Sequence, residues 1–85
     1  MCSKEISNHI KQVSHTLIKS GDEIDWLKER NKLSLYKKGL QEWLKQIRKY
    51  LKQANLTSIE ISIIAGEKKR IQYKLKDVSA RLQNM

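Results

Sequence analysis

Few side chains in this sequence have the type and spacing that catalysis or metal binding requires. His9 and His15 lie six residues apart, whereas side chains that meet on one face of a helix lie three or four apart. Cys2 is the only cysteine, so the chain can form neither an internal disulfide nor a cysteine-rich zinc site. The three glycines are isolated and build no phosphate-binding loop. We therefore expect a protein that is not an enzyme and that needs no metal and no cofactor.

Basic side chains are the main candidates for a function. The chain carries 18 Lys and Arg against 9 Asp and Glu, which gives a net charge of +9 and a pI of about 9.9. This excess is uneven, because residues 28–53 hold nine bases and two acids, whereas residues 1–27 have a net charge of −1. A strongly basic segment in a small domain favours an acidic partner such as a nucleic acid.

The bases of the middle segment form one stripe if that segment is helical. They recur at intervals of three, four and seven residues, the intervals that bring side chains to one helix face. The stripe consists of Lys38, Lys45, Arg48, Lys49 and Lys52. Lys37 extends it, and a second group, Lys68, Lys69 and Arg70, supports it. Lys and Arg release the counterions of a phosphate backbone, so the stripe predicts salt-dependent binding of DNA or RNA without strong sequence specificity.

Other interpretations of the basic stripe stay open. A row of cations is often only the solvated face of a helix. The helices or their basic face could instead dock on an acidic partner protein, as in an adapter or inhibitor. A basic amphipathic helix can also lie on an anionic membrane, but its apolar face would then be free, and here the apolar stripes can bury one another. Apolar seam residues that the bundle does not bury further predict a homo-oligomer.

The elements that must position these residues have the pattern of helices. The chain has no proline and three glycines, which favours long helices. Apolar residues alternate at intervals of three and four near 3–19, 22–53 and 58–84. The clearest seam is Leu33, Tyr36, Leu40, Trp43, Ile47, Tyr50 and Ala54, widened by Leu44 and Leu51. We predict a single all-α domain, residues 1–85, folded as a small three-helix antiparallel bundle.

Two Ser/Thr-x-x-Glu sequences indicate where helices begin. Ser20 and Glu23 have the spacing of a capping box, and Gly21 between them can end the preceding helix. Thr57 and Glu60 repeat this spacing. We therefore expect the second helix to begin at residue 22 and the third at residue 58.

The third segment has an alternative structure. Apolar and polar residues alternate with period two over 59–63 and again over 71–75, on both sides of a basic stretch. This is also the pattern of a β-hairpin at about 57–76, which would make the fold α+β, with two helices and a hairpin. We favour the helix because one seam, with Lys68 as its single polar interruption, accounts for Ile61, Ile64, Lys68, Ile71, Leu75, Val78, Leu82 and Met85. Tyr73 lies off this seam and is expected at the surface.

The N-terminal region shows no targeting sequence. Residues 1–17 contain no uninterrupted apolar run, which a secretory signal would require. No window of the chain approaches the apolar length of a membrane span. We expect the protein in the cytoplasm or in the interior of a host cell.

Overall fold

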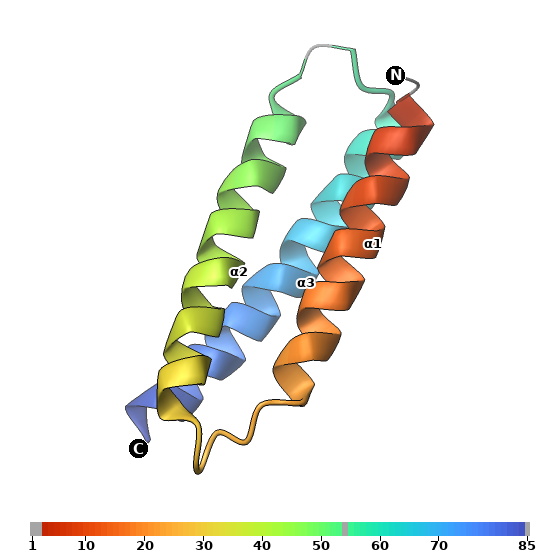
Figure 1. The fold of residues 1–85 in the computed structure, drawn as a ribbon. Helices are drawn as coiled ribbons and strands as arrows, with labels where there is room; N and C mark the ends of the chain where they lie inside the picture. Colours follow the sequence, from red (N-terminus) through yellow and green to blue (C-terminus); the bar gives the residue numbers. More distant parts are fainter. Residues whose placement is uncertain (1–2, 54, 85) are drawn as a thin grey trace.

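The computed structural model describes residues 3–53 and 55–84. In this part of the chain the backbone forms three helices, α1 (Ser3–Asp22), α2 (Arg30–Leu51) and α3 (Ser58–Gln83), and no strand (Figure 1). The predicted all-α three-helix bundle is therefore confirmed.

The alternative hairpin at about 57–76 is wrong, because residues 58–76 all lie in α3. Ile64, Ile71 and Val78, spaced seven residues apart, are at most 2% exposed, and a helix buries all three on one face. The predicted capping box starts this helix, since the Thr57 hydroxyl accepts from the Glu60 amide at 3.2 Å. Helical periodicity thus overrides the local strand propensity of the isoleucines, which are left exposed at positions 59, 61 and 63.

The helix α3 is the central element of the bundle. It packs against both α1 and α2, whereas α1 and α2 touch each other less. α2 runs antiparallel to the other two helices, and α3 crosses behind them from the start of α1 to the start of α2 (Figure 1). All three helices contribute to the core, whose buried apolar members are Ile10, Leu33, Tyr36, Leu40, Leu44, Ile47, Ile64, Ile71 and Val78.

The predicted seams are largely those that the structure buries, with one correction in α3. Ile61 is 44% exposed, and the carboxylates of Glu60 and Glu67 are buried instead. Both carboxylates accept hydrogen bonds, from Thr57 and from Arg70 respectively, which lowers the free-energy cost of their burial. Two predicted seam positions, 54 and 85, lie outside the described residues.

The start of α2 differs from the prediction. α1 continues to Asp22, residues 23–29 form an irregular turn, and α2 begins at Arg30 instead of residue 22. The Ser20 hydroxyl donates to the Leu17 carbonyl at 2.9 Å, so Ser20 does not cap a new helix. The Asp25 carboxylate instead accepts from the Leu27 amide at 3.1 Å, a local turn interaction that competes with helix.

A tertiary contact explains why α1 does not end at Gly21. Tyr36 of α2 lies against this last turn of α1, and its hydroxyl donates to the Leu17 carbonyl at 2.6 Å. A Cβ on Gly21 would overlap the Tyr36 ring. Gly21 is helical and has no positive φ, so the glycine provides space for the ring and does not reverse the chain.

Candidate nucleic-acid interface

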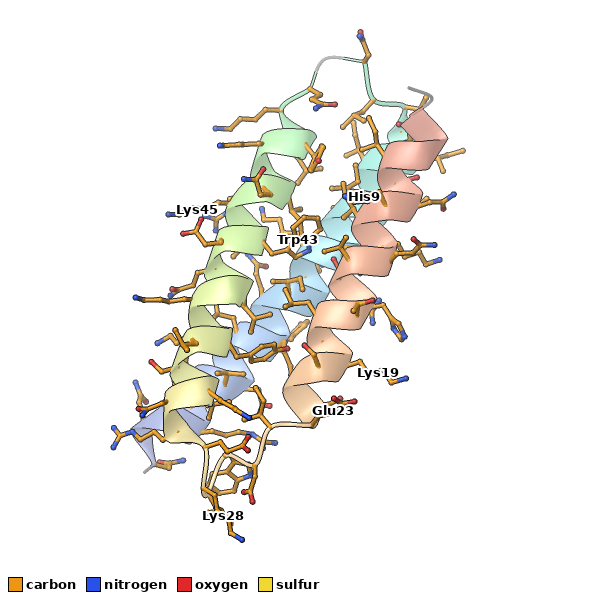
Figure 2. The ribbon with its side chains drawn as sticks, in the orientation of Figure 1. His9, Lys19, Glu23, Lys28, Trp43 and Lys45 are labelled. Carbon is orange, nitrogen blue, oxygen red and sulfur yellow. The ribbon has the colours of Figure 1, made fainter. Side chains whose placement is uncertain are left out.

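The outward side of α2 carries most of the basic stripe. The buried residues of α2 lie on the opposite side of the helix, which faces α1 and α3. Lys38, Lys45, Arg48, Lys49 and Lys52 are exposed, and Figure 2 shows Lys45 pointing away from α1 and α3. From Lys38 to Lys52 the row is about 21 Å long at the helical rise of 1.5 Å per residue.

Two of the predicted residues are less exposed than the others. Lys37 and Lys68 are half-buried, whereas the other predicted bases are exposed. Lys68 stands ten residues into α3, and because α2 is antiparallel to α3, it is level with the middle of α2. Lysine stems can cover apolar surface while the ammonium group stays in water. The α3 bases therefore lie level with the middle of the α2 row.

We call this surface the basic face. It consists of Lys37, Lys38, Lys45, Arg48, Lys49, Lys52, Lys68 and Lys69. Among the described residues, Lys45 is the one member that forms an ion pair, to Glu42 at 3.7 Å. Both partners are about two-thirds exposed or more, so this pair contributes little stability and can open to another anion.

Arg70 lies apart from the basic face. Its Nη1 donates to both oxygens of the buried Glu67 carboxylate at 3.1 Å. It also lines shallow hollows on the α1 side of α3, next to Lys11, His15 and Tyr73. Arg70 therefore has a carboxylate partner within α3, whereas Lys68 and Lys69 form no ion pair within the described chain.

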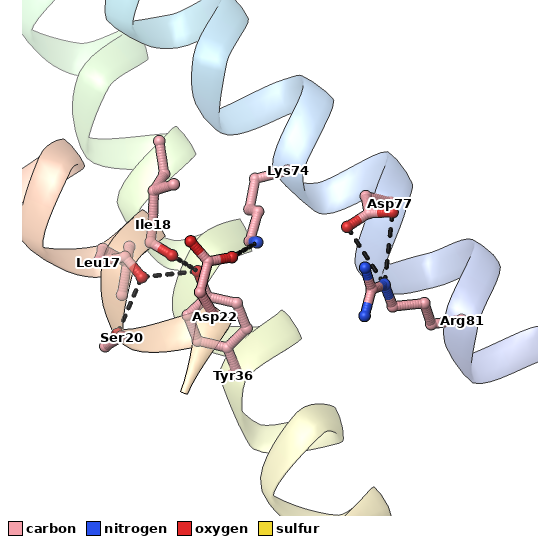
Figure 3. Close-up of polar contacts among 8 residues, drawn as sticks. All are labelled: Leu17, Ile18, Ser20, Asp22, Tyr36, Lys74, Asp77 and Arg81. Carbon is pink, nitrogen blue, oxygen red and sulfur yellow. Dashed lines mark hydrogen bonds and ion pairs between the residues drawn. The ribbon is translucent and has the colours of Figure 1, made fainter. Parts of the chain in front are cut away.

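A polar cluster that the sequence did not indicate lies between the α1–α2 turn and α3 (Figure 3). Lys74 Nζ donates to Asp22 at 2.6 Å, and this hydrogen bond holds the pKa of Asp22 below its usual value. Arg81 pairs with Asp77 at 3.3 Å and stands 5.6 Å from the centre of the Trp26 ring. These side chains line a hollow of about 350 Å³. Each cation already has a carboxylate partner. The Lys74–Asp22 pair joins α3 to the end of α1, and the contact between Arg81 and Trp26 joins α3 to the turn.

The histidines do not meet in the structure. His9 lies edge-on to Trp43, with ring centres 6.4 Å apart, between α1 and α2 (Figure 2). His15 is exposed on α1. In the described part of the chain, no three His, Cys, Asp or Glu side chains come together as a metal site. Cys2 lies outside the described residues.

Two further findings bear on the function. Within residues 3–53 and 55–84, no helix is both long and apolar enough to cross a membrane. Comparisons of the chain with protein-family models, with curated proteins and with solved structures found no match.

Proposed function

We propose that this protein is a non-enzymatic binding module whose basic face contacts the phosphate backbone of DNA or RNA without strong sequence specificity. One observation carries the proposal: the solvent-facing row of cations along α2 and its C-cap has, except at Lys45, no carboxylate partner within the described chain. This role places the protein where nucleic acid is present, in the cytoplasm or in the interior of a host cell.

The physical basis is the mutual repulsion of these cations. Lys45, Lys49 and Lys52 follow one another at intervals of four and three residues, where like charges destabilise a helix slightly. A phosphate backbone relieves that repulsion and loses its own condensed counterions. The contacts read backbone charge and not base edges, so affinity should depend strongly on salt and weakly on sequence.

Fluorescence anisotropy with mixed-sequence duplex DNA, single-stranded DNA and RNA, titrated from low to physiological salt, tests this proposal. We expect binding that persists at physiological salt, with a plot of log K against log salt that falls by about 0.9 per phosphate contacted in duplex DNA and about 0.7 in single strands. Binding that vanishes above low salt for all three nucleic acids would reject the proposal.

Neutralising the row tests the assignment of residues. Because Lys38, Arg48 and Lys49 lack in-chain ion pairs, we expect the triple change of these residues to Gln to lower the salt slope by about 2 to 3. The matched control changes Lys11, Lys19 and Lys28 to Gln, which removes the same charge from exposed positions on α1 and the turn. Figure 2 shows Lys19 and Lys28. Equal losses in the two variants would show that net charge alone attracts the nucleic acid.

Docking on an acidic protein is the second candidate function. Ile61 is 44% exposed on α3, and contacts to phosphate alone would leave this apolar surface unused. A pull-down in which the control variant captures an acidic protein and the neutralised variant does not, together with failure of the anisotropy test, would favour this function.

A further inference from the structure

The row of cations along α2 and its C-cap, which we call the α2 row, has no aromatic side chain among its members. It consists of the exposed residues Lys38, Lys45, Arg48, Lys49 and Lys52. Nucleic acids offer a protein two kinds of surface: the charged phosphate backbone, and the flat faces of unpaired bases, which stack on aromatic rings. The positions of the aromatic side chains therefore decide which form of nucleic acid suits the α2 row.

The aromatic residues of α2 lie on another side of this helix. Tyr36 is buried against the end of α1. Trp43 is half-buried, and its Nε1 donates to Ser14 Oγ of α1 at 2.9 Å. Tyr50, also half-buried, follows Trp43 by seven residues and shares its side of the helix. At 3.6 residues per turn, Trp43 and Tyr50 stand at least about 100° around α2 from each base of the row. Figure 2 shows Trp43 towards α1 and Lys45 away from it.

The other two of the five aromatic residues, all of which the structure describes, lie outside α2. Trp26 belongs to the α1–α2 turn and is packed against the core, with Arg81 5.6 Å from the centre of its ring. Tyr73 is 72% exposed on α3, where it lines a shallow hollow together with Asp77. Lys69 precedes Tyr73 by four residues, so Tyr73 accompanies a base of α3 and none of the α2 row.

The cations of the α2 row are also of a kind that binds phosphate without stacking. All are lysines except Arg48. A guanidinium group can stack on a base, whereas a lysine ammonium group is a compact point charge. Proteins that bind single strands combine a charged groove with aromatic rings, and each stacked base typically contributes about 5-fold to about 150-fold in affinity. The α2 row supplies the charge for such binding but not the rings.

A double strand offers more to such a row than a single strand does. Duplex DNA is stiff over about 150 base pairs and carries one charge per about 1.7 Å of its axis, so its phosphates need little ordering to meet a row of cations on a helix. The salt slope is about 0.9 per contact in duplex DNA and about 0.7 in single strands. For five contacts this difference is about 1, which corresponds to roughly 7-fold in affinity at about 0.15 M salt. We infer that the basic face prefers double-stranded to single-stranded nucleic acid, an inference that rests on the proposed function and narrows its ligand.

Fluorescence anisotropy with a duplex and with each of its separated strands, all of one mixed sequence, tests this preference. Affinities are compared at about 0.15 M salt, with concentrations counted per strand. We expect the DNA duplex to bind at least ~5-fold more tightly than either strand, and the same order for an RNA duplex and its strands. Single strands that bind as tightly as their duplex would overturn the inference and leave the proposed function standing. Failure of every nucleic acid to bind would reject both.

Adding a ring to the α2 row tests the physical reason for the preference. Gln41 is exposed and lies three residues after Lys38 and four before Lys45, so Gln41→Trp places a stacking surface within the row. We expect this variant to bind single strands at least ~5-fold more tightly than wild type, and the duplex within about 2-fold of wild type. Gln12→Trp is the matched control, because Gln12 is an exposed glutamine of α1 with no Lys or Arg three or four residues away. Equal gains in the two variants, or no gain for Gln41→Trp, would overturn the inference.

Removing the exposed ring of α3 tests whether Tyr73 already serves single strands. Tyr73 is highly exposed, so Tyr73→Ala should leave the fold intact, which circular dichroism checks. We expect the affinities for duplex and single strands to stay unchanged. A loss of ~5-fold or more for single strands alone would show that bases stack on Tyr73 and would overturn the inference.

Discussion

Tyr36 connects α2 to the end of α1 through both its ring and its hydroxyl. The ring fills the space above Gly21, and the hydroxyl donates to the Leu17 carbonyl at 2.6 Å. Burial raises the pKa of Tyr36 to about 12, and the nearby Asp22 carboxylate adds to this effect. A phenol with a raised pKa favours the folded state only while it is protonated.

Tyr36→Phe should therefore change the stability of the fold in a pH-dependent way. Near neutral pH we expect a loss of about 0.5–1.5 kcal/mol, because one hydrogen bond is removed. The unfolded phenol titrates near pH 10 and the folded one near 12, so the contribution of Tyr36 is complete below pH 10 and is lost as the pH rises towards 12. Urea unfolding of both proteins between neutral pH and pH 12 measures this difference. If the free energies of unfolding of wild type and variant differ by a constant amount above pH 10, this prediction is contradicted.

At the scale of single helices, two glycines differ in what surrounds them. Gly21 lies in the last turn of α1 under the Tyr36 ring, whereas Gly39 lies within α2 with open space around it. Local propensity alone would treat both as weak points of a helix. The difference arises from what a neighbouring helix places beside each glycine.

Alanine substitutions at these glycines should have opposite effects on stability. We expect Gly21→Ala to lower the free energy of unfolding by about 1–3 kcal/mol, because the methyl group overlaps a packed ring. Gly39→Ala should raise it by about 0.5–1 kcal/mol, because alanine lowers the entropic cost of the helix and meets no neighbour. Thermal and urea unfolding would measure both. If both substitutions changed the free energy of unfolding in the same direction, the Tyr36 ring would not pack against Gly21.

At the scale of the whole molecule, stability depends on one thin core arranged around α3. α1 and α2 both pack on this helix, so apolar residues of α2 that face it should contribute far more than those that face water. Leu40 is fully buried, and Leu35 of the same helix is 68% exposed. The two leucines provide a comparison in which residue type and helix are held constant.

Leu40→Ala should cost about 2–5 kcal/mol, since it removes buried surface and leaves a cavity. Leu35→Ala should change stability by less than about 0.5 kcal/mol. Urea unfolding measures the free energy of unfolding of both variants. Similar losses for the two leucines would mean that α2 buries a different face from the one described.

The number of helices, their buried faces and the start of α3 were determined by the sequence alone. These features depend on neighbours within one or two helical turns: the three-four alternation of apolar residues in α2, and the contact between Thr57 and Glu60. The exposed row of bases on α2 was predictable for the same reason. The pair between Lys45 and Glu42 is equally local, three residues apart, and the spacing could have indicated it.

Only the tertiary structure decided the end of α1, the surroundings of the polar residues near the turn, and which apolar residues stay exposed. Tyr36 reaches a carbonyl 19 residues earlier in the chain, and Lys74 reaches Asp22 across 52 residues. No local spacing encodes such contacts, because they depend on how the helices pack. That packing leaves Ile61 44% exposed, although the predicted seam includes it, and buries Glu67, which the predicted seam leaves out.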